Sequence, residues 1–380
     1  MLLAKTDKGI TLFLVPKFLV NDDGSLGARN KYEIGGINHK MGCRGLTNVY
    51  WSLDDAEGYL VGEEGKGLAA MFYMMDEMRI HVGLGASVCG IRGFQESLSY
   101  AMERTQGKGL VPGEQMPIID HTDVKRMLLA QKGYSEGSLA LCMFAASLME
   151  SSQADDQLLL SILTPVVKSY PSEWCLEANK WALQVLGGFG YTRDYPIEQL
   201  YRDNRLNMIH EGTHGIQALT LLGRYVRLFY CCYSLVLLLL LYCYSILILL
   251  LFYTYIHTHT GRSTRLGDGR GFQLLMSRMR GGVARARSLT SNKEPPTGSS
   301  NNGSSSSGGV DGGNSSVALC QALGEELEDA IARLEATTTT LLGTMSEGDV
   351  PLAMANAHEF LSMTGTTVVA WTWVSFFNLF

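Results

Sequence analysis

The sequence predicts a mostly helical α+β protein, in which a partial antiparallel β-domain precedes a bundle of helices. Short β-branched and aromatic runs between turn clusters fill the first 67 residues. After Leu68 the apolar residues recur at steps of three and four, as on one face of a helix. With 46% hydrophobic and 18% charged residues, a chain of 380 residues can also bury a substantial core.

The partial β-domain is expected in residues 1–67. Residues 10–15 and 48–52 have the composition of strands, and Asn21-Asp22-Asp23-Gly24 and Gly35-Gly36 are turn sequences between such runs. Short connections of this kind join antiparallel strands, so we expect a small antiparallel sheet.

The helical domain is expected in residues 68–224, with further apolar stripes in 122–149 and 173–186. The first stripe contains many methionines, which we interpret as core. A helix over 174–186 is predicted to end at the glycines of Gly187-Gly188-Phe189-Gly190. These glycines form either a plain C-cap or a site where a flat or anionic ligand approaches the backbone.

An apolar insertion occupies residues 225–267. Residues 228–255 contain no charge, Gly, Ala or Pro, and a helix of that length, roughly 42 Å, can cross a bilayer. Residues with T-rich codons dominate this run, and an alternating dinucleotide repeat can encode residues 253–260. Two interpretations stay open: a transmembrane-like segment, or a retained intron absent from the main messenger.

The remaining chain divides into three parts. Residues 268–292 continue the helical pattern, and residues 293–316 form a Ser/Gly-rich linker expected to be disordered. Residues 317–380 form a C-terminal helical extension, whose acidic residues 325, 326, 328 and 329 are predicted to face solvent. Its last aromatic residues, from Trp371 onward, have the pattern of an exposed tail.

Charge and cysteine content exclude several functions. The formal charge is −6, without a basic block, so nucleic acid is not expected as a partner. The eight cysteines form no C-x-x-C pair, which disfavours a zinc knuckle or disulfide framework and indicates a reducing compartment. Lys5, Asp7 and Lys8 interrupt the N-terminal apolar run, so we expect no secretory signal and an intracellular location, with mitochondria as one candidate.

Two short motifs are weak signals of a metal or nucleotide site. His210-Glu211-Gly212-Thr213-His214 matches the H-E-x-x-H pattern of zinc peptidases, but Gly212 weakens the required helix and no third ligand follows at a family spacing. Gly83-Leu84-Gly85 lacks the third glycine of a dinucleotide fingerprint. We therefore predict no metal site, and expect His214 to be an ordinary polar residue beside a loop.

A more specific pattern comes from five short motifs in fixed order. They are residues 184–191 (QVLGGFGY), 194–198 (DYPIE), 201–203 (YRD), 209–213 (IHEGT) and, upstream, 100–104 (YAMER). This order resembles the C-terminal helical domain of flavin-dependent acyl-CoA dehydrogenases. Residues 9–16, 39–42 and 58–63 resemble the second half of that family's middle β-domain. Residues 209–217, 272–278 and 353–360 are most similar to enzymes like 3-methylmercaptopropionyl-CoA dehydrogenase.

The resemblance implies a mechanism and a set of site residues. Glu211 matches the carboxylate that removes the α-proton of an acyl-CoA thioester while the β-hydrogen leaves as hydride to FAD, and apolar neighbours favour a basic carboxylate. FAD contacts are implied for Arg104, Thr105, Gln106, Gln184, Gly187, Gly188, Thr213 and Gly215. In that match, the pyrophosphate and ribityl region of FAD contacts Arg104, Thr105 and Gln106. The flavin of a neighbouring subunit contacts Gln184, Gly187 and Gly188. The adenine side is lined by Thr213 and Gly215. Substrate contacts are implied for Asp76, Arg79 and Gly212, with a surface ion pair as the alternative for Arg79.

The family's N-terminal helical domain and the first half of its β-domain have no counterpart in this sequence. We therefore expect a fragment that is inactive alone. The intact protein is expected to form homo-oligomers, as the resemblance implies. No feature of the sequence identifies its electron-transfer partner. Two other hypotheses are retained: a membrane-tethered helical protein without catalysis, if residues 228–255 are genuinely translated, and a zinc metallopeptidase.

Overall fold

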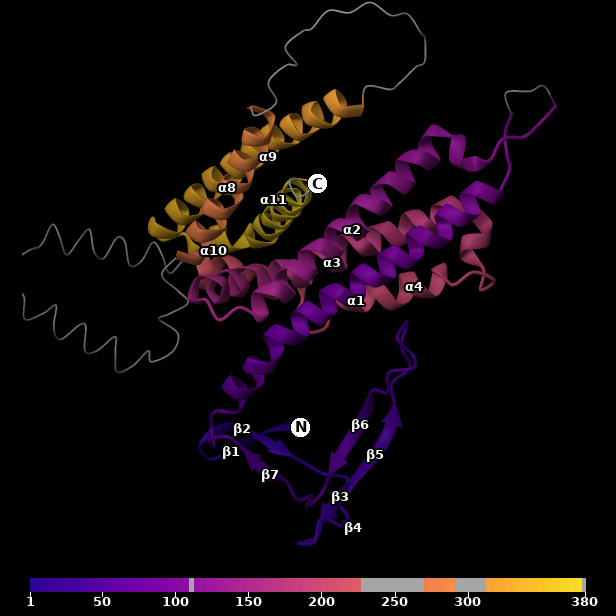
Figure 1. The fold of residues 1–380 in the computed structure, drawn as a ribbon. Helices are drawn as coiled ribbons and strands as arrows, with labels where there is room; N and C mark the ends of the chain where they lie inside the picture. The colour runs from indigo at the N-terminus through magenta and orange to yellow at the C-terminus, as the bar shows by residue number, and fades with distance from the viewer. Residues whose placement is uncertain (109–112, 227–269, 292–311, 378–380) are drawn as a thin grey trace, which may run out of the picture.

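The computed structural model describes residues 1–108, 113–226, 270–291 and 312–377. Within these residues a group of antiparallel strands precedes a larger assembly of helices (Figure 1), so the predicted fold class is confirmed. The strands are β1 Leu2–Thr6, β2 Gly9–Leu14, β3 Phe18–Val20, β4 Leu26–Arg29, β5 Tyr32–Ile37, β6 Val49–Leu53 and β7 Tyr59–Val61.

The strands form one three-stranded sheet, in the order β1-β2-β7, and two hairpins, β3-β4 and β5-β6. Leu12, one of two buried residues at the centre of β2, lies opposite Leu3 of β1 and Val61 of β7. Buried Asn30 joins separate segments, because its Nδ2 donates to the carbonyl oxygens of Pro16 at 3.0 Å and Glu57 at 2.8 Å. One amide side chain thereby satisfies backbone groups that no strand ladder reaches.

A loop of the β-domain is anchored on the helical part. The amide of Cys43 donates to Oδ1 of Asp203 at 2.6 Å, and Nη1 of Arg202 donates to the carbonyl oxygen of Met41 at 2.7 Å. A Cβ on Gly42 would lie 2.5 Å from the carbonyl oxygen of Arg202. The close approach therefore requires glycine, and it fixes the loop against α4 (Ile197–Asn204).

Three long helices form the centre of the helical part: α1 Gly67–Glu103, α2 Thr122–Met149 and α3 Ala154–Leu186. They lie side by side in Figure 1, and the larger buried core continues from them into residues 218–222, 270–291 and 312–377. Gly83 of α1 lies directly against α3, since a Cβ there would be 2.2 Å from the carbonyl oxygen of Val167. Gly83 of the 83–85 motif thus belongs to helix packing, whereas a Cβ on Gly85 would meet nothing within 4 Å.

The expected helix 174–186 is too short. Helix α3 begins twenty residues earlier, at Ala154, and contains Pro165 and Pro171. A proline inside a helix costs about 3 kcal/mol. Four fully buried side chains between Leu159 and Pro171 (Ile162, Leu163, Val166 and Val167) offset this cost, because burying each contributes about 1.5–3 kcal/mol.

Four more helices pack on one side of the central three (Figure 1): α8 Arg270–Ser291, α9 Gly312–Ser346, α10 Val350–Ala355 and α11 Ala357–Phe377. Helix α11 contacts α2, α3, α8 and α9, so its apolar surface is enclosed. The acidic residues predicted to face solvent on α9 are exposed. Short α5 (His214–Leu219) runs into one wide turn of π-helix, Thr220–Val226.

Two expectations for the C-terminal part are wrong. The sequence predicts that the linker continues to residue 316, but α9 begins at Gly312. The terminal aromatic residues were expected to be exposed, but Trp371 is 5% exposed and meets the ring of Phe144 edge-on at 5.2 Å. Contacts between α11 and α2 bury this side chain.

The apolar run at residues 228–255 lies outside the described residues. In the described ranges, no helix combines the length and the apolar character needed to cross a bilayer.

Candidate functional site

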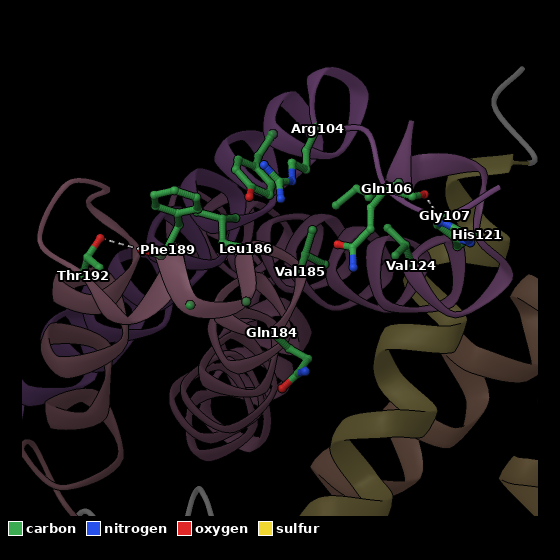
Figure 2. Close-up of a pocket in the computed structure, with 14 residues that line it drawn as sticks. Arg104, Gln106, Gly107, His121, Val124, Gln184, Val185, Leu186, Phe189 and Thr192 are labelled. Atoms are coloured by element: carbon green, nitrogen blue, oxygen red, sulfur yellow. Dashed lines mark hydrogen bonds between the residues drawn. The ribbon is translucent and has the colours of Figure 1, made fainter. Parts of the chain in front are cut away.

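A cavity of about 690 Å³ lies where α1 ends, α2 begins and α3 ends. Five of the residues singled out in the sequence line it: Arg104, Gln106, Gln184, Gly187 and Gly188. Figure 2 shows the side chains from these three segments around the hollow. Residues about eighty positions apart in the chain are thus brought to one place.

The glycines keep one wall of the cavity open. Gly187 ends α3 with φ +58°, in the left-handed region that favours glycine. A Cβ on Gly187 or Gly188 would meet no other atom within 4 Å. Packing within the protein therefore does not require glycine at either position. A ligand in the cavity can approach this backbone directly.

The other wall carries positive charge. Arg104 caps the C-terminus of α1, where a cation interacts favourably with the helix dipole, and its carbonyl oxygen accepts from the amide of Ile118 at 2.8 Å. His121, at the start of α2, bonds through Nε2 to the carbonyl oxygen of Gln106 at 2.9 Å. A guanidinium group beside the N-terminus of a 28-residue helix suits an anionic ligand.

A cluster of three aromatic rings lies at this site, and two of them, Tyr100 and Phe189, line the cavity. Tyr100, Phe189 and Tyr195 pack around one another with centroids 5.7 to 6.4 Å apart. The sequence interpretation missed Tyr100, Ile118, His121, Val124, Phe189 and Thr192 among the lining residues. Phe189 lies inside a motif that was recognised, whereas His121 carries no local signal, because only the meeting of α2 with the end of α1 brings it to the cavity.

Glu211 lies in a different region, in the turn before α5. Its φ is +54° and that of Gly212 is +93°, so two successive residues are left-handed. Fully buried Gln217 holds this turn, since its Nε2 donates to the carbonyl oxygens of Glu211 at 3.0 Å and Gly212 at 3.4 Å. Thr213 then caps α5, and Gly215 lies in its first turn. None of residues 211–215 lines the cavity, and neither does Thr105.

The two histidines of the H-E-x-x-H motif have separate surroundings, because residues 210–213 are a turn and not a helix. His214 is buried, against the expectation of a polar residue beside a loop. Its Nδ1 lies 3.2 Å from Oε2 of Glu173, and its ring stacks on His358 of α11 at 6.1 Å. The hydrogen bond from His214 lowers the pKa of Glu173. Within the described ranges no three His, Cys, Asp or Glu side chains are placed to hold a metal ion.

Two buried basic residues accompany the Glu211 turn. Arg79 of α1 is 7% exposed, so the alternative interpretation, that Arg79 forms an ion pair at the surface, is wrong. Asp76 lies three residues earlier on the same helix. Lys168 of α3 is completely buried. Burial, and then the charge of Arg79, lower the pKa of Lys168 to about 8, while the charge of Glu211 opposes this shift.

Comparison with known proteins agrees with the motifs. Residues 65–225 match the family model of the acyl-CoA dehydrogenase C-terminal domain, and residues 308–376 match a model described as acetyl-CoA dehydrogenase C-terminal like. The chain belongs to the acyl-CoA dehydrogenase family. The resemblance inferred from the sequence is therefore confirmed.

A similar curated protein is 3-methylmercaptopropionyl-CoA dehydrogenase of Ruegeria pomeroyi, which is 37% identical over 228 residues. That alignment covers 58% of this chain and 39% of the relative, so the chain spans about two fifths of the relative's length.

Two solved structures share the fold over almost the whole chain. ACDH-11 of Caenorhabditis elegans in complex with C11-CoA gives a TM-score of 0.61 at 16% identity, covering 98% of this chain and 53% of that one. An acyl-CoA dehydrogenase complexed with FAD from Bacillus anthracis gives 0.60 at 16% identity, covering 97% and 52%.

Proposed function

We propose that this chain is part of an FAD-dependent acyl-CoA dehydrogenase, which removes two hydrogens from the α and β carbons of an acyl-CoA thioester. The observation that carries the proposal is the cavity that gathers Arg104, Gln106, Gln184, Gly187 and Gly188. We also infer that residues 1–67 are part of a β-domain and residues 68–224 a helical domain, which residues 268–292 continue, and that a helical extension begins at residue 312.

The residues of the cavity fit the cofactor. The paired donors of the Arg104 guanidinium suit a diphosphate, and the amides of Gln106 and Gln184 suit hydroxyl groups. The open backbone at Gly187 and Gly188 lets a flat group approach closely. Because both groups of residues line one cavity, we infer that they contact the same FAD, held jointly with a second copy of the protein. When bound, FAD supplies the acceptor for the β-hydride.

Glu211 is proposed as the base for the α-proton. Its backbone is left-handed, and Gly212 beside it has no side chain, which leaves room for the thioester. A Cβ on Gly212 would lie 2.6 Å from Nε2 of Gln217, so a larger residue would displace the side chain that holds the turn. We assign Asp76 and Arg79 to the acyl-CoA, and Thr213 and Gly215 to the adenine side of FAD.

The test uses the full-length protein that contains this chain. Glu211→Gln keeps the size and polarity of the side chain but removes its basicity, so flavin and acyl-CoA should still bind. Flavin reduction by acyl-CoA, followed anaerobically by bleaching, should fall at least ~10²-fold, the usual effect of removing a general base. Glu177→Gln is the matched control, because Glu177 lies on α3 in a surface pair with Lys180 and should leave the rate unchanged.

Two outcomes would contradict the assignment. Flavin reduction at the parental rate in Glu211→Gln would remove Glu211 from the chemistry. Inhibition by a chelator, with equal losses in His210→Ala and His214→Ala, would instead support the zinc hypothesis.

A further inference from the structure

Helix α5 follows the Glu211 turn directly, and its two ends are held in different ways. Beyond its C-terminal end, Leu221 and Leu222 are fully buried and hold that end by apolar packing. Near its N-terminal end, Gly215 has no side chain and Ile216 is 51% exposed. Apolar packing there is weak, so the placement of the N-terminal end depends on polar contacts.

His214, the first residue of α5, makes such a contact with α3. The side chain is buried, and its Nδ1 lies 3.2 Å from Oε2 of Glu173. Because a carboxylate oxygen in an ionised group only accepts, Nδ1 carries the hydrogen. Within the described part of the chain Nε2 has no hydrogen-bond partner. Glu173 therefore provides the hydrogen bond that orients this ring.

The ring needs this hydrogen bond because packing leaves space beside it. A cavity of about 210 Å³ borders Ser169, Glu173, His214 and His358. The ring of His358, on α11, lies nearly parallel to that of His214, with 6.1 Å between the centroids. The hydrogen bond from His214, and then the charges of His214, His358 and Arg205, lower the pKa of Glu173, which keeps this carboxylate ionised and accepting.

From α5 the constraint passes to Glu211 through Gln217. The amide of Gln217 donates to the carbonyl oxygen of Thr213 at 3.0 Å, in the first turn of the helix. Its Nε2 donates to the carbonyl oxygens of Glu211 at 3.0 Å and Gly212 at 3.4 Å. Both left-handed residues are thus tied to one side chain of α5. A non-glycine residue in this conformation is strained and persists only where its surroundings enforce it.

We propose that the hydrogen bond between Glu173 and His214 positions Glu211, and that α5 connects the two sites through Gln217. This inference rests on the proposed function of Glu211. Without the bond, the N-terminal end of α5 can shift, and the strained turn that it holds relaxes. The carboxylate then lies further from the α-proton, and a misplacement of about 1 Å can slow a reaction ~10²-fold.

The first test is single-turnover flavin reduction in the full-length protein, at saturating FAD and acyl-CoA. Glu173→Met removes the acceptor with little effect on packing, because the Glu173 side chain is 48% exposed. The rate constant should fall roughly 5- to 30-fold while the amplitude of bleaching stays parental. Glu173→Gln keeps an acceptor oxygen and should stay within about twofold of the parent. Glu177→Met, one turn further along α3 in a pair with Lys180, is the matched control and should change nothing.

A double variant tests whether the effect passes through Glu211. In Glu211→Gln no base remains to be positioned, so adding Glu173→Met should slow the residual flavin reduction by less than about twofold. A further loss as large as that in the parental background would overturn the proposal.

Hydrogen exchange of the same proteins without substrate, followed by mass spectrometry, needs no activity. The amides of residues 211–217 should exchange roughly 3- to 10-fold faster in Glu173→Met than in the parent, because the turn opens more often when one hydrogen bond is lost. Glu177→Met should exchange as the parent does. Unchanged exchange of this segment in Glu173→Met would also overturn the proposal.

The outcomes separate this proposal from the function on which it rests. A parental rate constant in Glu173→Met would refute the positioning, and so would a parental rate constant with a lower amplitude, which indicates a purely structural role. Parental flavin reduction in Glu211→Gln would instead refute the function of Glu211. The exchange of residues 211–217 would then still decide whether Glu173 holds the turn.

Discussion

Gly83 is the position where a single methyl group should disturb the helical core most clearly. In Gly83→Ala the new Cβ would lie 2.2 Å from the carbonyl oxygen of Val167 and 3.2 Å from Sγ of Cys142. The first neighbour is backbone of α3, so relief requires α1 and α3 to separate. Such overpacking costs about 1–3 kcal/mol, and a backbone clash belongs at the upper end. Alanine regains about 1 kcal/mol of helix propensity, which leaves a net loss of about 2 kcal/mol.

Gly85→Ala is the matched control, because it lies on the same helix and its Cβ would meet nothing within 4 Å. It should stabilise the chain by about 0.5–1 kcal/mol through helix propensity alone. Urea unfolding followed by circular dichroism measures both variants. A Gly83→Ala protein as stable as the parent would refute the close packing of α1 on α3.

Two further predictions concern the cavity and the core. Arg104→Met in the full-length protein should weaken FAD binding by roughly 10- to 100-fold, because charge-assisted hydrogen bonds contribute about 1.5–3 kcal/mol. Arg126→Met is the control: it loses a surface ion pair with Asp123 and a contact with the Trp181 ring, and FAD binding, followed by fluorescence titration of flavin, should not change. Burial raises the pKa of the Cys142 and Cys175 thiols to about 12, so iodoacetamide at pH 8 should label them only after unfolding. Rapid labelling of either thiol in the native protein, seen by mass spectrometry, would contradict their burial.

The sequence by itself determined the local elements and the family. Local sequence patterns predict the short strands, the helix after Leu68 and the glycines that end α3. These patterns involve residues close together in the chain, so they can be read without knowledge of the tertiary structure. The motifs at residues 100–104 and between 184 and 213 identified the family, because their order along the chain can be read without knowledge of the fold. The same local reasoning placed Glu211 next to a permissive glycine.

Tertiary contacts decided the rest. Helix α3 continues through Pro165 and Pro171 because α1 and α2 bury its side chains, and Trp371 is internal because α11 meets α2. His121 reaches the cavity only because distant helix ends meet there. The burial of the Lys168 charge could not be predicted either, because it depends on contacts in three dimensions. The charged residues that act on Lys168, Arg79 and Glu211, lie some ninety positions before it and forty after it in the chain.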